Sequence, residues 1–507
     1  MLRTAKAIWN WVDDRLGLSE TLGPLAKHAV PKDAKWWYVF GSATLLAFIV
    51  QVVTGVVLAF SYIPSPSQAY QTLQFITNEA AFGRFMRGLH YYGASAMILM
   101  VGAHMAQVFL FGSYKFPREM SWVTGVLLLG FTLLMGFTGQ LLRWDQTAVW
   151  SVVVAAEQAG RFPLFGNAFA HFVLGGETVG GATLGRFFAI HVFLVPAGIF
   201  AFVGLHLMLV MRHGISEPPK VGEPVDPKTY RKKYQELLKK NGCPFWPDAA
   251  WRDIVFGTVM VLCLVLLAWF FGPPELGKPP DPSIIRADPR PDWYLLWYFA
   301  VLALMPDWME RYFMVLGPMF AGLLIIMLPF FFGKGERSPI RRPWAIAGVI
   351  MVVLTIGSFW YVGAKTPWSP NFDAPPLPVN VVGMETGPVA DGARLFHAKG
   401  CLNCHLIETF GGRRGPNLSN VGAKLSRSDI IIRIVNGGHN MPAYGNNLTP
   451  DQLNALVAFL QSRKKALVTL PGTTSQTIAS SSSVARETFG SKLHRYWSTT
   501  YRASGGN

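Results

Sequence analysis

Seven long apolar runs interrupt this chain of 507 residues. A hydrocarbon core of roughly 30 Å takes about 20 apolar residues per helix. Only 15% of the residues are charged and 51% are hydrophobic, which is too apolar for an ordinary soluble domain. The pattern predicts an all-α membrane protein whose seven spans lie at about 37–61, 89–111, 121–142, 185–211, 252–272, 308–332 and 343–363.

Basic residues concentrate in alternate loops. The segment before the first span, the connection 212–252 and the loop "GKGERSPIRRP" are basic, whereas 62–86 and 144–184 carry few Lys or Arg. Because cytoplasmic loops are enriched in Lys and Arg, we expect a cytoplasmic N-terminus and no cleavable signal peptide. An odd number of spans then places everything after about residue 365 outside, in the periplasm if the membrane is a bacterial inner membrane.

The net charge of +16 needs no nucleic acid, because the loop bias and attraction to anionic membrane lipid account for it. Composition divides the chain into five parts. The Pro-rich part should be an extended tether, and the Ser/Thr-rich tail should be disordered or ordered only on a partner. The parts are a four-span block at 1–215, a three-span block at 216–363, the linker 364–384, a small module at 385–465 and the tail 466–507.

The small module contains "CLNCH", residues 401 to 405. Cys401 and Cys404 followed at once by His405 form the attachment pattern of a covalent c-type heme, with thioether bonds from the thiols and iron ligation by the imidazole. A zinc half-site or a redox pair is the alternative. Only Cys243 and Cys263 remain elsewhere, one in a loop and one inside a span, so no second metal-binding pair exists. A c-type heme is attached outside the cytoplasm, which agrees with the predicted topology.

A second iron ligand should come from "HNMPAYG", where Met441 offers a thioether and His439 is the rival. The strings "GPNLSNVG" and "LTPDQLNALVAFLQSRK" make the module similar to a small all-α class I cytochrome c. In that family the Met of such a loop is the ligand, which favours Met441.

Four histidines lie inside apolar spans, where an imidazole needs a partner. The interval from His90 to His104 is fourteen residues, which places both on nearly one helix face about 21 Å apart. His191 and His206 are fifteen apart, and Pro196 could supply a compensating bend. A lone buried His is usually a satisfied hydrogen-bonding group. Two on each of two spans instead predict two non-covalent b-type hemes, an outer one between His90 and His191 and an inner one between His104 and His206.

Glycines repeat the same interval on the other two spans of this block. Gly41 and Gly55 are fourteen apart, as are Gly125 and Gly139. A heme plane needs space where helices pass, and Gly supplies it without a side chain. Glycine is common in membrane helices, but a matched interval on three spans favours a diheme four-helix bundle.

These residues, together with "QVVTG", "FMRGLHYYGAS", "GSYKFPREMSWVTGVLLL", "WDQTAVW", "TLGRFFAIHVFLVP" and "PDWY", resemble cytochrome b of the quinol-oxidising cytochrome bc complexes. Seven spans and the fifteen-residue interval are similar to the chloroplast-type branch, with its two separate membrane chains fused here. The resemblance implies that Arg87 and Arg118 meet heme propionates. It also implies an outer quinol-oxidising pocket between "WDQTAVWSVVVAAEQAG" and residues 291–294, and an inner quinone-reducing pocket near the inner heme.

Three positions depart from the family pattern. Val39 stands where the chloroplast-type branch attaches an extra inner heme through Cys, so no such covalent heme is expected. Arg143 replaces a Pro before "WDQ", with no role assigned to it. Asp292 replaces the usual Glu of the four-residue motif.

Asp292 is the candidate proton acceptor for quinol, with Tyr294 as a hydrogen-bonding neighbour. The alternative is that Asp292 pairs with Arg290 or Arg286, or caps the following helix.

The family mechanism needs a Rieske iron–sulfur protein, and without a second Cys/His set in this chain that protein must be another polypeptide. We expect a homodimeric complex that reduces a c-type cytochrome or another acceptor. The rival function is a diheme anchor that connects a dehydrogenase to the quinone pool without bifurcation.

Overall fold

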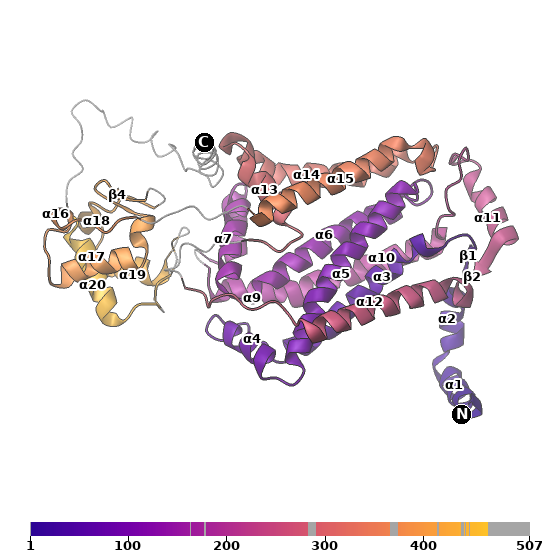
Figure 1. Ribbon diagram of the computed structural model, residues 1–507, viewed down its shortest axis with the longest axis horizontal. Coiled ribbons are helices and arrows are strands. Elements are labelled where there is room, and N and C mark those ends of the chain that lie inside the picture. Colours follow the sequence, from indigo (N-terminus) through magenta and orange to yellow (C-terminus); the bar gives the residue numbers. More distant parts are fainter. Residues whose placement is uncertain are drawn as a thin grey trace, which may run out of the picture.

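The computed structural model describes residues 2–162, 164–176, 179–281, 290–365, 374–412, 415–437, 441, 443–445 and 447–464. Long helices run side by side, and a small helical module lies beyond one end of them (Figure 1). The predicted all-α class is confirmed. In the described part of the chain, seven helices are long and apolar enough to span a membrane, at Phe40–Ala59, Gly83–Leu110, Glu119–Leu141, Gly181–His213, Phe245–Phe270, Tyr312–Phe332 and Pro343–Lys365.

The first block is a bundle of four long helices. Helix α3 packs against α5, and α6 packs against α10. Ala47, Phe48, Met97, Val195 and Ile199 form a buried cluster that joins these helices. The bundle consists of α3 (Phe40–Ala59), α5 (Gly83–Leu110), α6 (Glu119–Leu141) and a continuous span made of α9 (Gly181–Ala189), η2 (Ile190–Leu194) and α10 (Val195–His213).

The segment η2 is a π-helical turn that contains His191. The amide of Val195 donates to the carbonyl of Ile190, five residues back rather than four. Such a turn inserts one residue into a helix. It therefore absorbs the extra residue in the interval from His191 to His206, where the sequence suggested a bend at Pro196.

The second block covers two sides of the first. Helix α12 packs on α5 and α3, α14 packs on α6, and the short α13 packs on α15. These helices are α12 (Ala250–Phe270), α13 (Leu296–Leu304), α14 (Asp307–Phe332) and α15 (Pro343–Lys365), with the turns η3 (Phe245–Ala249) and η4 (Pro339–Arg341).

The two ends of the bundle differ in what they carry (Figure 1). One end holds the N-terminal segment and the basic connection, which form α1 (Leu2–Leu16), α2 (Leu18–Ala26), η1 (Trp36–Tyr38), α11 (Tyr230–Asn241) and the antiparallel pair β1 (Ala29–Pro31) and β2 (Gly242–Pro244). The opposite end holds α4 (Ala69–Asn78), α7 (Gln146–Gly160), α8 (Gly166–Leu174) and the small module. This segregation matches the loop assignment made from Lys and Arg.

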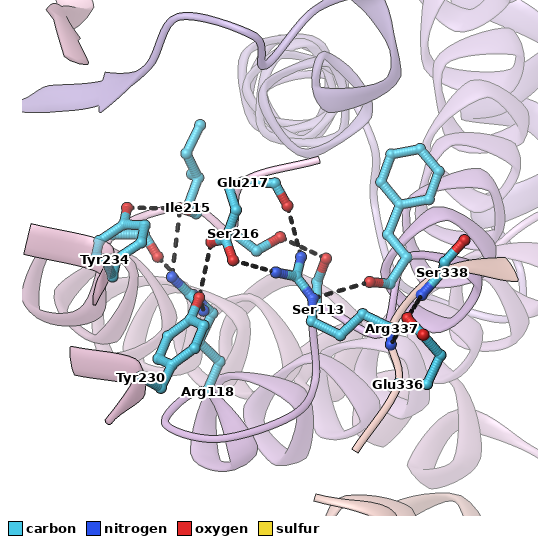
Figure 2. A network of polar contacts seen from close by, with 12 residues as sticks. Ser113, Arg118, Ile215, Ser216, Glu217, Tyr230, Tyr234, Glu336, Arg337 and Ser338 are labelled. Atoms are coloured by element: carbon cyan, nitrogen blue, oxygen red, sulfur yellow. Dashed lines mark hydrogen bonds and ion pairs between the residues drawn. The ribbon is translucent and has the colours of Figure 1, made fainter. Parts of the chain in front are cut away.

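A buried polar network ties the two blocks together at the basic end (Figure 2). Arg337, in the loop between α14 and α15, donates from Nη1 to Oε1 of Glu217 at 2.5 Å and from Nη2 to the Glu217 carbonyl at 2.6 Å. The hydroxyl of Tyr230 donates to the other Glu217 oxygen at 2.8 Å. Glu217 therefore joins the connection after α10 to the second block.

Each block also caps a helix of the other at this end. Lys115, which precedes α6, donates from Nζ to the carbonyls of Phe332 and Lys334 at the end of α14. Arg342 donates to the carbonyls of Phe109 and Leu110 at the end of α5. Cations at helix C-termini are stabilising, so these contacts fix the position of one block relative to the other.

Replacing Glu217 with Ala should destabilise the junction, because it leaves the guanidinium of Arg337, 4% exposed, without its anion. Breaking a buried ion pair costs about 3 to 5 kcal/mol. We expect a lower thermal midpoint for the detergent-purified protein, measured by circular dichroism. Glu223→Ala, at an exposed position of the same connection, is the matched control. Equal midpoints for the two variants would contradict a stabilising role for the pair.

The small module has its own core, in which α17 packs on α20 around Phe396, Leu402, Leu456 and Phe459. Its elements are α16 (Val379–Val382), α17 (Pro388–Ala398), η5 (Cys401–Asn403), β3 (Leu406–Ile407) paired with β4 (Phe410–Gly411), α18 (Val421–Lys424), α19 (Arg427–Asn436) and α20 (Pro450–Ser462). The predicted disordered tail, 466–507, lies outside the described residues, as does 366–373 of the linker.

Candidate functional site

The helix pairing brings two of the four membrane histidines face to face. The imidazoles of His90 on α5 and His191 on η2 have ring centroids 6.4 Å apart and planes at 81°. An iron held between two imidazoles, with metal–nitrogen distances of about 2 Å, separates the ring centroids by roughly 6 to 6.5 Å. The spacing would therefore let both residues hold one iron between them.

The four predicted glycines each lie against one histidine ring. Helix α3 presents its glycines to the histidines of α5, and α6 presents its glycines to those of η2 and α10. Gly139 is the tightest position, because a side chain there would press into the His191 ring. A Cβ would come within 3.3 Å of Cε1 of His104 at Gly41, 3.2 Å of His90 at Gly55, 3.6 Å of His206 at Gly125 and 2.6 Å of His191 at Gly139.

The two predicted propionate partners have different surroundings. Arg87 is buried and donates to Thr77 Oγ1 at 2.9 Å and to the Pro274 carbonyl at 3.0 Å, and neither of these acceptors carries a charge. Arg118 instead engages all three of its nitrogens within the network of Figure 2, where it donates to the Gly214 carbonyl at 2.8 Å, the Tyr230 hydroxyl at 2.7 Å and the carbonyls of His213 and Ile215. Arg87 is therefore the better-placed partner for an added anion.

The motif of the small module is also arranged for a heme. The ring of His405 donates from Nδ1 to the carbonyl of Pro416 at 2.9 Å, which leaves Nε2 for iron. Cys401 and Cys404 lie at the two ends of the η5 turn beside it. Met441 is half-buried in the structure, whereas its rival His439 lies outside the described residues. The choice between them stays a prediction.

The "WDQ" motif holds the two blocks together at the end of the bundle that carries α4 and α7. One oxygen of Asp145 accepts from the Ala148 amide at 2.8 Å and caps α7, and the other accepts from the Gly277 amide at 3.1 Å. Gln146 exchanges two hydrogen bonds with the backbone of Asp281, at 3.0 and 2.6 Å. The motif thus fastens the segment 272–281, between α12 and α13, to the first block.

Sequence reasoning missed this segment, which carries no recognisable motif. It also receives hydrogen bonds from Arg87 and from Tyr70, whose hydroxyl donates to the Gly277 carbonyl at 2.8 Å. On its far side, the Asn447 amide of the small module donates to the Asp281 carboxylate at 3.0 Å. The segment therefore links the "WDQ" motif to the module that carries "CLNCH".

Asp292 lies where the second block meets α6. Its amide donates to the side-chain oxygen of Gln140 at 3.1 Å. Burial raises the pKa of the Asp292 carboxyl, the charge of Arg143 lowers it and that of Asp145 raises it further. The Arg143 guanidinium, 3.8 Å from the Asp145 carboxylate, is thus the cation that favours an ionised Asp292. The structure thus gives a role to Arg143, which stands where the family pattern has Pro: its charge favours the ionised form of Asp292.

The structural alternatives for Asp292 gain no support. Among the described residues, no side chain pairs with or donates to its carboxylate, and Arg290 donates to the Ala364 carbonyl at 2.7 Å. Arg286 lies outside the described residues. The cap of α13 is Leu295 and has no side-chain cap.

The aromatic neighbours of Asp292 fix the motif in place. Trp293 donates from Nε1 to Ser95 Oγ on α5 at 3.2 Å. Tyr294 is buried against Gly136 of α6, and within the described structure its hydroxyl has no hydrogen-bond partner. Burial raises the pKa of that hydroxyl, so it is a neutral donor at physiological pH.

Comparisons with known proteins match both the membrane part and the small module. The family model "Cytochrome b/b6/petB" matches residues 25–214, and "Cytochrome C oxidase, cbb3-type, subunit III" matches 387–460. The menaquinol:cytochrome c reductase cytochrome b subunit of Geobacillus thermodenitrificans is 38% identical over 42% of this chain and 98% of its own length. Cytochrome b of Allochromatium vinosum is 32% identical over 66% of this chain and 81% of its own.

Two further matches extend beyond the first block. Cytochrome b/c1 of Bradyrhizobium diazoefficiens is 30% identical over 70% of this chain and 50% of its own length. The solved structure of a hyperthermophilic respiratory complex III matches with a TM-score of 0.61 at 28% identity, and the match covers 71% of this chain and 91% of that one.

Fold, paired histidines and the "CLNCH" module together define a multi-pass membrane cytochrome that combines b-type and c-type domains. The chain belongs to the cytochrome b/b6 family, with a cytochrome c domain at its C-terminal end.

Proposed function

We propose that this chain is the cytochrome b subunit of a quinol:cytochrome c oxidoreductase, with the c-type carrier fused to it. The observation that carries the proposal is the meeting of the "WDQ" segment with Asp292. They come from different blocks, yet Asp292 lies close enough to Arg143 and Asp145 for their charges to act on its carboxyl. Its amide contacts Gln140, the residue after Gly139, which lies against the His191 ring. A diheme anchor for another dehydrogenase has no need for such a meeting of the two blocks.

The chain would hold three hemes. His90 and His191 would hold the outer b-type heme, His104 and His206 would hold the inner one, and Arg87 would face a propionate. Cys401, Cys404, His405 and Met441 would hold the c-type heme. When bound, these groups supply one-electron carriers from the outer pocket to both sides of the membrane.

Asp292 is the proton acceptor for quinol at the outer pocket. Among the described residues no side chain donates to its carboxylate, and Arg143 favours its ionised form. Tyr294 orients the quinol oxygen through its hydroxyl, which has no hydrogen-bond partner in the described part of the chain. A positioned base of this kind needs a raised pKa to work near neutral pH.

The partners follow from the two electrons and two protons that each quinol gives up. One electron would go to a Rieske iron–sulfur protein in another chain and the other to the inner pocket, where two such electrons, from two quinols, and two protons would reduce one quinone. The protons of each quinol would be released outside, which couples proton release to turnover. The c domain, linked to the outer pocket through Asp281 and Asn447, passes electrons to a c-type cytochrome or similar acceptor. We place the basic end in the cytoplasm of a bacterial inner membrane, in a homodimeric complex.

Potentiometric titration of the complex purified from membranes tests the function. Two b-type signals, one c-type signal and a Rieske signal in electron paramagnetic resonance are expected, together with quinol-dependent reduction of the c-type heme. A preparation with the b-type signals but neither a Rieske signal nor quinol-dependent c-heme reduction would favour the anchor and overturn the proposal.

A further inference from the structure

The four membrane histidines differ in what supports their second ring nitrogen. Nδ1 of His90 lies 2.9 Å from Thr54 Oγ1, and Nδ1 of His191 lies 3.1 Å from Thr138 Oγ1. For His206 the distance to Thr124 Oγ1 is 2.9 Å. Each threonine immediately precedes one of the four glycines in sequence.

These contacts have a defined polarity. Each threonine hydroxyl donates to the carbonyl four residues earlier in its own helix: Val50 at 2.6 Å, Leu134 at 2.9 Å and Met120 at 3.0 Å. Its proton is therefore used, and its oxygen must accept from the imidazole. The bond places the imidazole proton on Nδ1 and leaves Nε2 for iron.

His104 has no such support. Its Nδ1 is buried and has no hydrogen-bond partner among the described residues. The glycine that it faces, Gly41, is preceded by Phe40 rather than by Thr. The nearby hydroxyl of Ser42 is directed elsewhere, because it donates to the Val39 carbonyl and lies 2.7 Å from Asp253 Oδ1.

An acceptor at Nδ1–H raises the basicity of a ligating imidazole, and a more basic ligand stabilises the oxidised metal. We propose that Thr54, Thr124 and Thr138 are positioning residues that set imidazole basicity, and that Phe40 withholds this support from His104, which makes the inner b-type heme easier to reduce. The difference favours electron flow from the outer pair to the inner pair. This inference rests on the ligand assignment of the proposed function.

The chain supplies its own template for a test. Gly41 is placed relative to His104 as Gly55 is relative to His90, since a Cβ on either glycine would lie 3.3 or 3.2 Å from the ring carbon Cε1, and Phe40 precedes Gly41 as Thr54 precedes Gly55. In Phe40→Thr the new hydroxyl oxygen should therefore accept a hydrogen bond from Nδ1 of His104. Phe40→Val, of the same shape as Thr but without the hydroxyl, is the matched control.

The readout is the midpoint potential of each b-type heme in the purified complex. Phe40→Thr should lower the ratio of reduced to oxidised inner heme about fivefold at a fixed ambient potential, as expected for one hydrogen bond, which is about 40 mV for one electron. Phe40→Val should not reproduce this shift, and the outer heme should be unchanged in both variants.

A second pair keeps the test decisive if position 40 tolerates no change. Thr138→Val should raise the potential of the outer heme, and Thr138→Ser should restore it. The inference would be overturned if the outer-heme potential were the same with and without the hydroxyl at position 138. It would also be overturned if the inner-heme potential shifted equally in Phe40→Thr and Phe40→Val. Absence of two b-type signals in the unmodified complex would instead overturn the ligand assignment beneath it.

Discussion

Asp292→Asn is expected to slow quinol oxidation by about 10²-fold or more, because a positioned general base contributes roughly 10² to 10⁴ to a rate. The substitution keeps the size of the side chain and the backbone contact with Gln140. All three heme spectra should therefore stay intact. The measurement is quinol-dependent reduction of the c-type heme by stopped flow, and unchanged turnover would return Asp292 to a structural role.

The pH dependence of the same reaction provides the control. Because burial raises the pKa of Asp292 above its ordinary value near 4, the ionised base is lost as pH falls through that raised pKa. Turnover should decline as pH falls, and the decline should occur at a pH above the usual pKa range of an exposed Asp. Asp292→Glu should keep such a limb, and Asp292→Asn should lose it.

His191→Leu is expected to remove the outer b-type heme and abolish electron transfer to the inner pocket. The geometry behind this expectation is the 6.4 Å spacing between the His90 and His191 rings, which fits a shared iron. Reduced-minus-oxidised spectra should lose half of the b-type signal and none of the c-type signal. The retained c-type signal reports that the chain still folds and exports its C-terminal domain.

His213→Leu is the matched control for this variant. His213 is the last residue of α10, where its backbone carbonyl accepts a hydrogen bond from Arg118. It should keep every heme signal. Full b-type absorbance in His191→Leu would refute the ligand assignment, as would equal losses in the two variants.

Features that depend on spacing along one helix were predictable. The rise of 1.5 Å per residue is local, so apolar runs predicted the seven spans, and the fourteen-residue interval predicted two tiers of histidines. The c-type heme site was equally predictable from "CLNCH", because heme attachment needs only a short stretch of chain. The resemblance to cytochrome b drew on similar local strings and pointed to Asp292.

What tertiary structure decided was which neighbours each side chain meets. A fifteen-residue interval could not reveal the π-helical turn that contains His191. The sequence could not show that Arg118 donates to Tyr230, or that the charge of Arg143 acts on Asp292, because the partners lie far apart in the chain. The sequence shows the three threonines that hydrogen-bond imidazoles and the Phe that leaves His104 without such a bond. Their meaning depends on contacts across helices, and local periodicity does not encode which helix faces which.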